Sequence, residues 1–239
     1  MNGIIQQKRR TIYTVRLSNL LFVTERSGLI NLKNEGVPES RVFFTGNVMI
    51  DSLVNYLPLA ENSNIHNDLM LERNKYILVT LHRPTNVDDH NGLKALLNLL
   101  NSLSKKRKLV FPVHPRTKTN MIKFGLDNFP DKNVIITEPA GYIDFLSLIK
   151  NAELIITDSG GIQEESTFLG VQCITVRNNT ERPVTVEVGT NQLVGTNLQN
   201  VESSALAVLE GKIKKGKIPE LWDGKAAERI SEIIIKHLT

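Results

Sequence analysis

Short apolar runs alternate with stretches of helical periodicity along most of this chain, and this alternation limits the folds open to it. Five runs of four to six residues cover 76–81, 109–113, 134–137, 154–157 and 173–176. They are too uniformly apolar for strands with one wet face, so they indicate a parallel sheet buried on both faces. Helices between parallel strands imply right-handed crossovers. The sequence therefore predicts a doubly wound, Rossmann-like α/β fold.

The remaining elements suggest a two-part organisation. Further strands are expected at 20–24, 42–45 and 192–194, and helices at 31–35, 49–59, 92–103, 118–124, 142–152, 161–169, 201–209 and 226–237. Residues 1–60 are interpreted as the end of a preceding α/β domain followed by a polar linker over 61–67. Residues 61–239 are interpreted as the Rossmann-like domain with closing helices.

Composition excludes several classes of protein. A hydrophobic content of 41% is ordinary for a globular chain. The net charge of +4 comes largely from 105–108 and 212–217, which are expected to be solvated surface rather than a nucleic-acid site. No apolar run approaches a membrane span, and no secretory signal is recognised. The single Cys173 excludes a disulfide framework and favours a cytoplasmic location.

Polar and basic residues gather where the predicted strands end. His82 and Arg83 follow the first of the five runs, and His114 and Arg116 follow the second. Ligands of open parallel sheets bind beyond the carboxyl ends of the strands. The basic character of this edge indicates an anionic ligand. No cluster of His, Cys and Asp has metal-ligand spacing, so neither a metal nor a cofactor is expected.

The segment 158–165, Asp-Ser-Gly-Gly-Ile-Gln-Glu-Glu, is the most informative one. Gly160 and Gly161 would let the backbone turn tightly and would let a ligand approach it closely. They open a predicted helix, whose first N–H groups are a ready phosphate site after Ser159. Glu165 lies one turn further along the same helix face, where a carboxylate can accept hydrogen bonds from both ribose hydroxyls. The alternative is a glycine-softened turn followed by an exposed carboxylate.

Each of the other candidate residues also has a structural interpretation. Arg182 could fork onto a diphosphate, or it could pair with Glu181 at the surface. His82 could contact phosphate or transfer a proton, or it could be structural. Phe145 could stack on a base or belong to the core, and Tyr142 opens the same predicted helix beside this edge.

Together these segments resemble the non-hydrolysing UDP-N-acetylglucosamine 2-epimerases. The combination of 158–165 with Thr-Glu-Arg-Pro at 180–183 is specific, and further matches lie at 31–37, 45–51, 80–84, 114–117 and 138–145. The resemblance implies two Rossmann-like domains of glycosyltransferase-B type, with UDP on the C-terminal one.

The resemblance also implies roles and a reaction. Phe145 would contact uracil, Glu165 the ribose, and His82 would be an active-site histidine. The diphosphate would be bound by Ser159, Gly160, Gly161 and Arg182. The family interconverts UDP-N-acetylglucosamine and UDP-N-acetylmannosamine for cell-surface polysaccharide precursors. It eliminates UDP to leave a glycal, and then adds UDP back after reprotonation at the neighbouring carbon.

Two departures from the family pattern affect the expected activity. Thr85 stands where the family often has Glu, two residues after His-Arg. Gln6 and Gln7 stand where the family motif Pro-Glu-Glu-x-Asn-Arg has its carboxylates, and only Arg10 fits. The N-terminal domain of the family is almost wholly absent. The sequence is therefore interpreted as a truncated form that binds UDP and is inactive by itself.

Two other functions stay open on the sequence. One is the donor domain of a glycosyltransferase-B enzyme, and the other is a non-catalytic UDP-sugar-binding module. In all three cases a UDP-sugar is the expected ligand, with neither nucleic acid nor membrane as partner. The sequence also leaves a homodimer open.

Overall fold

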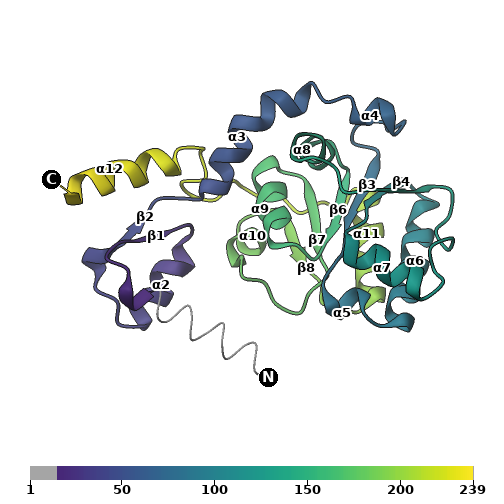
Figure 1. The fold of residues 1–239 in the computed structure, drawn as a ribbon, viewed down its shortest axis with the longest axis horizontal. Helices are drawn as coiled ribbons and strands as arrows, with labels where there is room; N and C mark the ends of the chain where they lie inside the picture. Colours follow the sequence, from purple (N-terminus) through teal and green to yellow (C-terminus); the bar gives the residue numbers. More distant parts are fainter. Residues whose placement is uncertain (1–14, 239) are drawn as a thin grey trace. The chain divides into compact units, whose positions relative to one another are not determined.

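A computed structural model describes residues 15–238 of the chain (Figure 1). The comparison of Gln6, Gln7 and Arg10 with the acidic motif therefore lies outside the described residues. The chain forms two compact units, which are described separately below. One comprises the described parts of Met1–Asp51 and Glu220–Thr239, and the other is Ser52–Pro219.

The second unit is built on a six-stranded sheet in which every neighbouring pair of strands is parallel. Its strands are β3 (Tyr76–Thr80), β4 (Lys108–Pro112), β5 (Val134–Thr137), β6 (Leu154–Thr157), β7 (Gln172–Thr175) and β8 (Asn191–Leu193). Their spatial order is β5-β4-β3-β6-β7-β8. The chain thus winds outward from β3 to β5, returns to the other side of β3, and winds outward again. This confirms the predicted doubly wound sheet.

Helices cover both faces of this sheet (Figure 1). The helices that lie wholly or partly in this unit are α3 (Val48–Glu61), which begins in the first unit, α4 (Ile65–Asp68), α5 (Pro84–Val87), α6 (His90–Ser104), α7 (Pro115–Lys123), α8 (Tyr142–Lys150), α9 (Gly160–Leu169), α10 (Pro183–Glu187) and α11 (Leu198–Leu209).

Strand residues of β3 separate the two hydrophobic layers. Ile77 and Val79 are buried together with the leucines of α6 and with Val201 of α11. Tyr76 and Leu78 are buried on the opposite side, against Leu148 of α8. Successive side chains of a strand point to opposite faces. An apolar residue is therefore required at every position, and this explains the unbroken apolar runs of the sequence.

The polar linker over 61–67 stays a prediction, and the structure shows which elements this segment contains. Helix α3 continues to Glu61, and the short helix α4 follows. Ser63 organises this segment, because its hydroxyl accepts from the N–H of Ile65 at 3.2 Å and donates to Asp144 at 2.6 Å. The polar side chain of Ser63 thus makes local hydrogen bonds to a backbone N–H and to a neighbouring side chain.

The first unit contains a small parallel sheet of β1 (Leu21–Val23) and β2 (Val42–Phe44), joined through α2 (Arg26–Asn34) and the 3-10 helix Glu39–Arg41. The closing helix α12 (Ala226–Leu238) belongs to the same unit. The domain division at residue 60 stays a prediction, and the compact units group α12 with the N-terminal segment.

Three contacts bind the closing segment within this first unit. The Asp51 carboxylate accepts from the first two N–H groups of α12, those of Ala226 at 3.1 Å and Ala227 at 2.6 Å. The indole N–H of Trp222 donates to the carbonyl of Thr24 at 3.0 Å. Gly46 has φ +86°, and a Cβ there would lie 2.0 Å from the carbonyl oxygen of Leu221. The motif at 45–51 is thus a docking point for the last helix.

Among the helices of residues 15–238, none has the length and apolar character needed to span a bilayer.

We expect Asp51→Ala to lower the free energy of unfolding of the first unit by about 1–3 kcal/mol. The substitution leaves two helix N-terminal N–H groups without their charged acceptor. Urea unfolding followed by fluorescence measures this, because Trp222 is the only tryptophan of the chain and lies in this unit.

Glu39→Ala is the matched control, because it removes an exposed carboxylate that pairs with Lys33 at 3.3 Å. Such a pair contributes little, so this variant should stay within about 0.5 kcal/mol of the parent. Equal stability of both variants would show that Asp51 does not hold α12.

Candidate functional site

The candidate site lies where the strand order of the second unit reverses. His82 follows β3 after one residue, and Asp158 follows β6 directly. These two strands are neighbours, and Thr80 pairs with Thr157 at their carboxyl ends. The crevice at such a switch point is the usual ligand site of open α/β sheets.

Asp158 is fully buried and connects the two strand ends. Its carboxylate accepts from the N–H of His82 at 3.0 Å and of Arg83 at 2.8 Å, and from the amide of Asn86 at 2.9 Å. The His82 ring adds a contact from Nδ1 at 3.0 Å. Burial raises the pKa of Asp158, but the hydrogen bonds from His82, Arg83 and Asn86 outweigh it and hold the pKa below its usual value. Asp158 is therefore an ionised acceptor at neutral pH.

The N-terminus of α9 is open toward this edge. Ser159 precedes the helix and its side chain makes no capping hydrogen bond. The first N–H groups of a helix without a cap lack intrahelical partners and favour an anion. A Cβ added to Gly160 or Gly161 would meet no atom within 4 Å.

Of the two reasons expected for Gly160 and Gly161, the structure does not support the tight turn. Neither Gly160 nor Gly161 is among the glycines with positive φ. The backbone therefore does not need glycine for a tight turn here. The open space over both residues agrees with the other expected reason, the close approach of a ligand to the backbone.

Glu165 lies on α9, one turn beyond Gly161, as predicted. It is buried rather than exposed, and its Oε1 accepts from the Tyr142 hydroxyl at 3.2 Å. Burial raises the pKa of Glu165 to about 7, against the lowering effect of the Tyr142 hydrogen bond, and the neighbouring Glu164 raises it further. A carboxylate kept out of water in this way is suited to accept hydrogen bonds from a ligand.

The side chain of Arg182 pairs with the carboxylate of Glu164 and not with that of Glu181. Its Nε lies 2.6 Å from Oε1 of the buried Glu164. Glu181 pairs instead with Arg177, with both guanidinium contacts at 2.7 Å, and the Arg177 hydrogen bond lowers the pKa of Glu181 to about 2. The alternative interpretation, a surface pair of Arg182 with the Glu181 carboxylate, is therefore wrong. Glu164 instead holds the Arg182 guanidinium beside α9.

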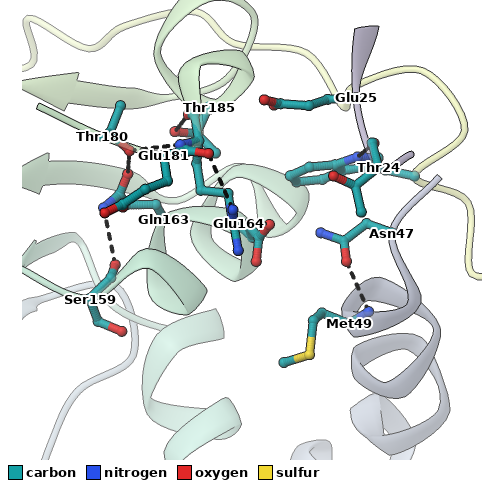
Figure 2. A network of polar contacts seen from close by, with 12 residues as sticks. Thr24, Glu25, Asn47, Met49, Ser159, Gln163, Glu164, Thr180, Glu181 and Thr185 are labelled. Carbon is teal, nitrogen blue, oxygen red and sulfur yellow. Dashed lines mark hydrogen bonds and ion pairs between the residues drawn. The ribbon is translucent and has the colours of Figure 1, made fainter. Parts of the chain in front are cut away.

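A polar network holds the loop that carries Arg182 (Figure 2). The side-chain Oε1 of Gln163 accepts from the Thr180 hydroxyl at 2.6 Å, and its Nε2 donates to the backbone carbonyl of Ser159 at 3.2 Å. Thr180 also accepts from the N–H of Arg182 at 3.0 Å, and Thr185 donates to the carbonyl of Arg182 at 2.7 Å. Gln163 thus connects the turn at the start of α9 with the Arg182 loop.

A cavity of about 210 Å³ opens at the carboxyl ends of the central strands. Five of its lining residues are predicted or neighbouring site residues, namely His82, His114, Phe145, Ser159 and Ile162. The rings of His82 and His114 lie 5.1 Å apart. Phe145 is half-buried and also packs against the core, so the binding and the core interpretation are both compatible with its position.

Arg116 lies outside this cavity. Its guanidinium pairs with Asp88, and it lines a separate polar hollow with Lys123. The structure thus brings His82, His114, Phe145 and Ser159 to one cavity, but not Arg116. Arg83 contacts Asp158 through its side chain as well, with Nε donating to the Asp158 carbonyl at 3.1 Å.

Sequence reasoning missed Asp158 and Gln163 as working parts of this site. The signal for Asp158 was its place directly after a buried strand, next to the glycines. Gln163 gave no signal, because only the fold brings Thr180 to it. Among residues 15–238, no group of His, Cys, Asp and Glu could hold a metal ion.

These features define a class of protein: a doubly wound α/β domain with an uncapped helix N-terminus and a cavity at its switch point. Comparison with known proteins gives the family. The family model for UDP-N-acetylglucosamine 2-epimerase matches residues 2–235, and the chain belongs to this family.

Individual relatives agree with this assignment. The UDP-N-acetylglucosamine 2-epimerase of Methanocaldococcus jannaschii is 40% identical over 93% of the chain, which covers 62% of that relative. A UDP-2,3-diacetamido-2,3-dideoxy-D-glucuronate 2-epimerase of Pseudomonas aeruginosa is 34% identical over 94% of the chain, again covering 62% of the relative.

A crystal structure of the Methanocaldococcus jannaschii enzyme in complex with UDP-GlcNAc and UDP is 39% identical, with a TM-score of 0.82 over 92% of this chain and 62% of that one. This likeness confirms the expected fold of glycosyltransferase-B type. The chain spans less than two thirds of the length of these relatives.

We expect ionisation of Glu165 to weaken the fold as pH rises. Its pKa in the folded protein, about 7, is above the ordinary value of 4.5. The stabilising contribution is therefore complete below pH 4.5 and is lost as pH rises through about 7. The loss over the whole range should be on the order of 3 kcal/mol.

The measurement compares the parent with Glu165→Gln by urea unfolding at several values between pH 5 and pH 8. The other titrating groups are common to both proteins, so the difference between the two curves isolates Glu165. As pH rises, the free energy of unfolding of the parent should fall relative to that of Glu165→Gln. A difference independent of pH would show that Glu165 titrates normally.

Proposed function

We propose that this chain binds the UDP moiety of a UDP-N-acetylhexosamine, as the nucleotide-binding part of a UDP-N-acetylglucosamine 2-epimerase. The observation that carries the proposal is the open N-terminus of α9 with a buried carboxylate one turn above it, at the switch point of the sheet. An anion at the helix end and a diol beside the carboxylate are what a nucleoside diphosphate offers.

The proposed contacts follow the order of the ligand's parts. Phe145 contacts uracil from the wall of the cavity, and Glu165 accepts from the two ribose hydroxyls. The N–H groups of Gly160 and Gly161, the Ser159 hydroxyl and the Arg182 guanidinium bind the diphosphate.

Glu164 contributes indirectly, because its pairing with Arg182 fixes the guanidinium beside the helix end. Arg83, His114 and Tyr142 line or support the same edge. Arg116 stays a weaker candidate, since it pairs with Asp88.

The chemistry proposed for this site is the departure and return of UDP. When the bond between the sugar and the diphosphate breaks, negative charge develops on the terminal phosphate. Preorganised N–H donors and an arginine stabilise that charge without having to reorganise. His82, at the mouth of the cavity, is the proposed proton-transfer or phosphate-binding group. This supports an isomerase that acts by elimination and re-addition of UDP.

The setting of the reaction is part of the proposal. We infer a cytoplasmic enzyme that supplies precursors for cell-surface polysaccharides, because Cys173 is unpaired and buried and nucleotide sugars are cytoplasmic substrates of such synthesis. We also propose that the enzyme works as a homodimer. No added cofactor is required by the groups that form the site.

We expect Arg182→Ala to weaken UDP binding tenfold to a hundredfold. Hydrogen bonds to charged groups contribute about 1.5–3 kcal/mol, and each 1.4 kcal/mol is tenfold in affinity. Calorimetric titration with UDP measures the loss. Arg107→Ala is the control of equal charge, because Arg107 pairs with Glu153 beside the amino end of β4 and should leave affinity unchanged.

The ribose contact of Glu165 has its own test. The parent should bind UDP more tightly than 2′-deoxy-UDP, since one of two hydrogen bonds to a buried carboxylate is lost with the deoxy ligand. Glu165→Ala should bind both ligands weakly and equally. Unchanged UDP affinity in both Arg182→Ala and Glu165→Ala would overturn the assignment of the site.

We expect the 239-residue polypeptide, assayed by itself, to bind UDP without converting UDP-N-acetylglucosamine. Removal of a proton from an unactivated C–H bond needs a base, and groups of this kind contribute about 10²–10⁴ in rate. The resemblance assigns this base to carboxylates of the family's N-terminal domain, which His82 and His114 do not replace, and Glu165 is assigned to ribose. Isotope-labelled substrate and product separation measure turnover. Conversion to the mannosamine epimer at an enzyme-like rate would place the base within these residues.

A further inference from the structure

We propose that Asp158 is a positioning residue for His82, which it fixes in one tautomer with the proton on Nδ1 and with Nε2 presented to the ligand. The proposal deepens the function given above and rests on it only where UDP is used as the ligand. The orientation of His82 itself is a property of the unliganded chain.

The hydrogen-bonding capacities of a carboxylate and an imidazole decide which ring nitrogen of His82 carries the proton. An ionised carboxylate only accepts hydrogen bonds, and a neutral imidazole has one nitrogen that donates and one that accepts. Nδ1 of His82 lies 3.0 Å from Oδ1 of Asp158. The nitrogen that faces Asp158 must therefore carry the proton. The partner of one ring nitrogen sets the state of the other, so Nε2 keeps its lone pair.

The carboxylate itself is held so that it cannot turn away. Three other donors converge on it, from the backbone N–H groups of His82 and Arg83 and from the side chain of Asn86. The group is fully buried. An imidazole bound to such an acceptor is fixed in direction as well as in tautomer, since a rotated ring would leave a buried charge with one donor fewer.

The other edge of the ring is free for a ligand. Within residues 15–238, Nε2 of His82 takes part in no hydrogen bond, and the side chain is 38% exposed. His82 lines the same cavity as Ser159, next to the open end of α9. With Nδ1 bound to Asp158, a proton is exchanged with a bound molecule at Nε2 alone. Neutral His82 accepts there, and protonated His82 donates there while Asp158 stabilises the imidazolium.

The test starts with the tautomer in the unliganded protein. Long-range proton–nitrogen correlation spectra of the ¹⁵N-labelled chain distinguish protonated from unprotonated ring nitrogens. The chain has five histidines, and His82→Gln identifies the signal of His82 by its loss. We expect neutral His82 to carry its proton on Nδ1. A proton on Nε2 would overturn the proposal, whatever the result of any ligand experiment.

Two variants then separate positioning from simple support of the fold. Asp158→Asn should release His82 to a mixture of tautomers and weaken UDP about tenfold. Asn86→Ala removes a different donor from the same carboxylate, at 2.9 Å, without touching His82. It should leave the tautomer unchanged and the UDP affinity within about twofold. Equal effects of the two variants on tautomer and affinity would show that Asp158 only supports the loop.

Failure of the proposed function and failure of the His82 orientation give different results in these experiments. If Asp158→Asn does not fold, the spectra of the parent and of Asn86→Ala still decide the tautomer. If the parent binds no UDP in calorimetry, the proposed function fails, while the Nδ1–H signal can still confirm the orientation of His82. If the parent binds UDP and His82 is protonated on Nε2, the orientation fails alone.

Discussion

The carboxylate of Asp158, directly after β6, holds the carboxyl end of β3 in place by accepting hydrogen bonds from the residues that follow it. These strands are adjacent in the sheet but far apart in the sequence, and the N–H groups of His82 and Arg83 would lose their acceptor without Asp158. A buried charge is tolerated only when it is fully hydrogen-bonded. Asp158 meets this condition through donors that are themselves the residues of the site, so the geometry of the switch point and that of the site are set together.

Three consecutive residues of α9, the helix that follows Asp158, each contact a different neighbouring side chain. Gln163 connects Ser159 with Thr180, Glu164 pairs with Arg182, and Glu165 accepts from Tyr142. Because successive residues of a helix point in directions about 100° apart, each side chain reaches a different neighbour. The run Gln-Glu-Glu is thus explained by three separate contacts rather than by negative charge as such.

The sequence predicted the elements better than the contacts. Every predicted strand is present within one or two residues, because burial on both faces leaves a continuous apolar signal in β3, β4 and β6. The short helices α5 and α10, which begin at Pro84 and Pro183, were not predicted, since four or five residues carry no periodicity. The position of Glu165 followed from helical spacing. The partner of Arg182 did not, because Glu164 and Glu181 are equally plausible until the loop is folded.

The attachment of α12 to Asp51 affects the order in which the two units can complete their folding. Residues 52–219 form a contiguous unit, so they can fold as soon as they leave the ribosome. The first unit is different, because its strands β1 and β2 are synthesised before residues 52–219, while Trp222 and α12 are synthesised after them. Until residues 221–227 are synthesised, Asp51 has no helix to cap and Gly46 has no chain to pack against. Of the two units, the one whose first strands are synthesised earlier is therefore completed later.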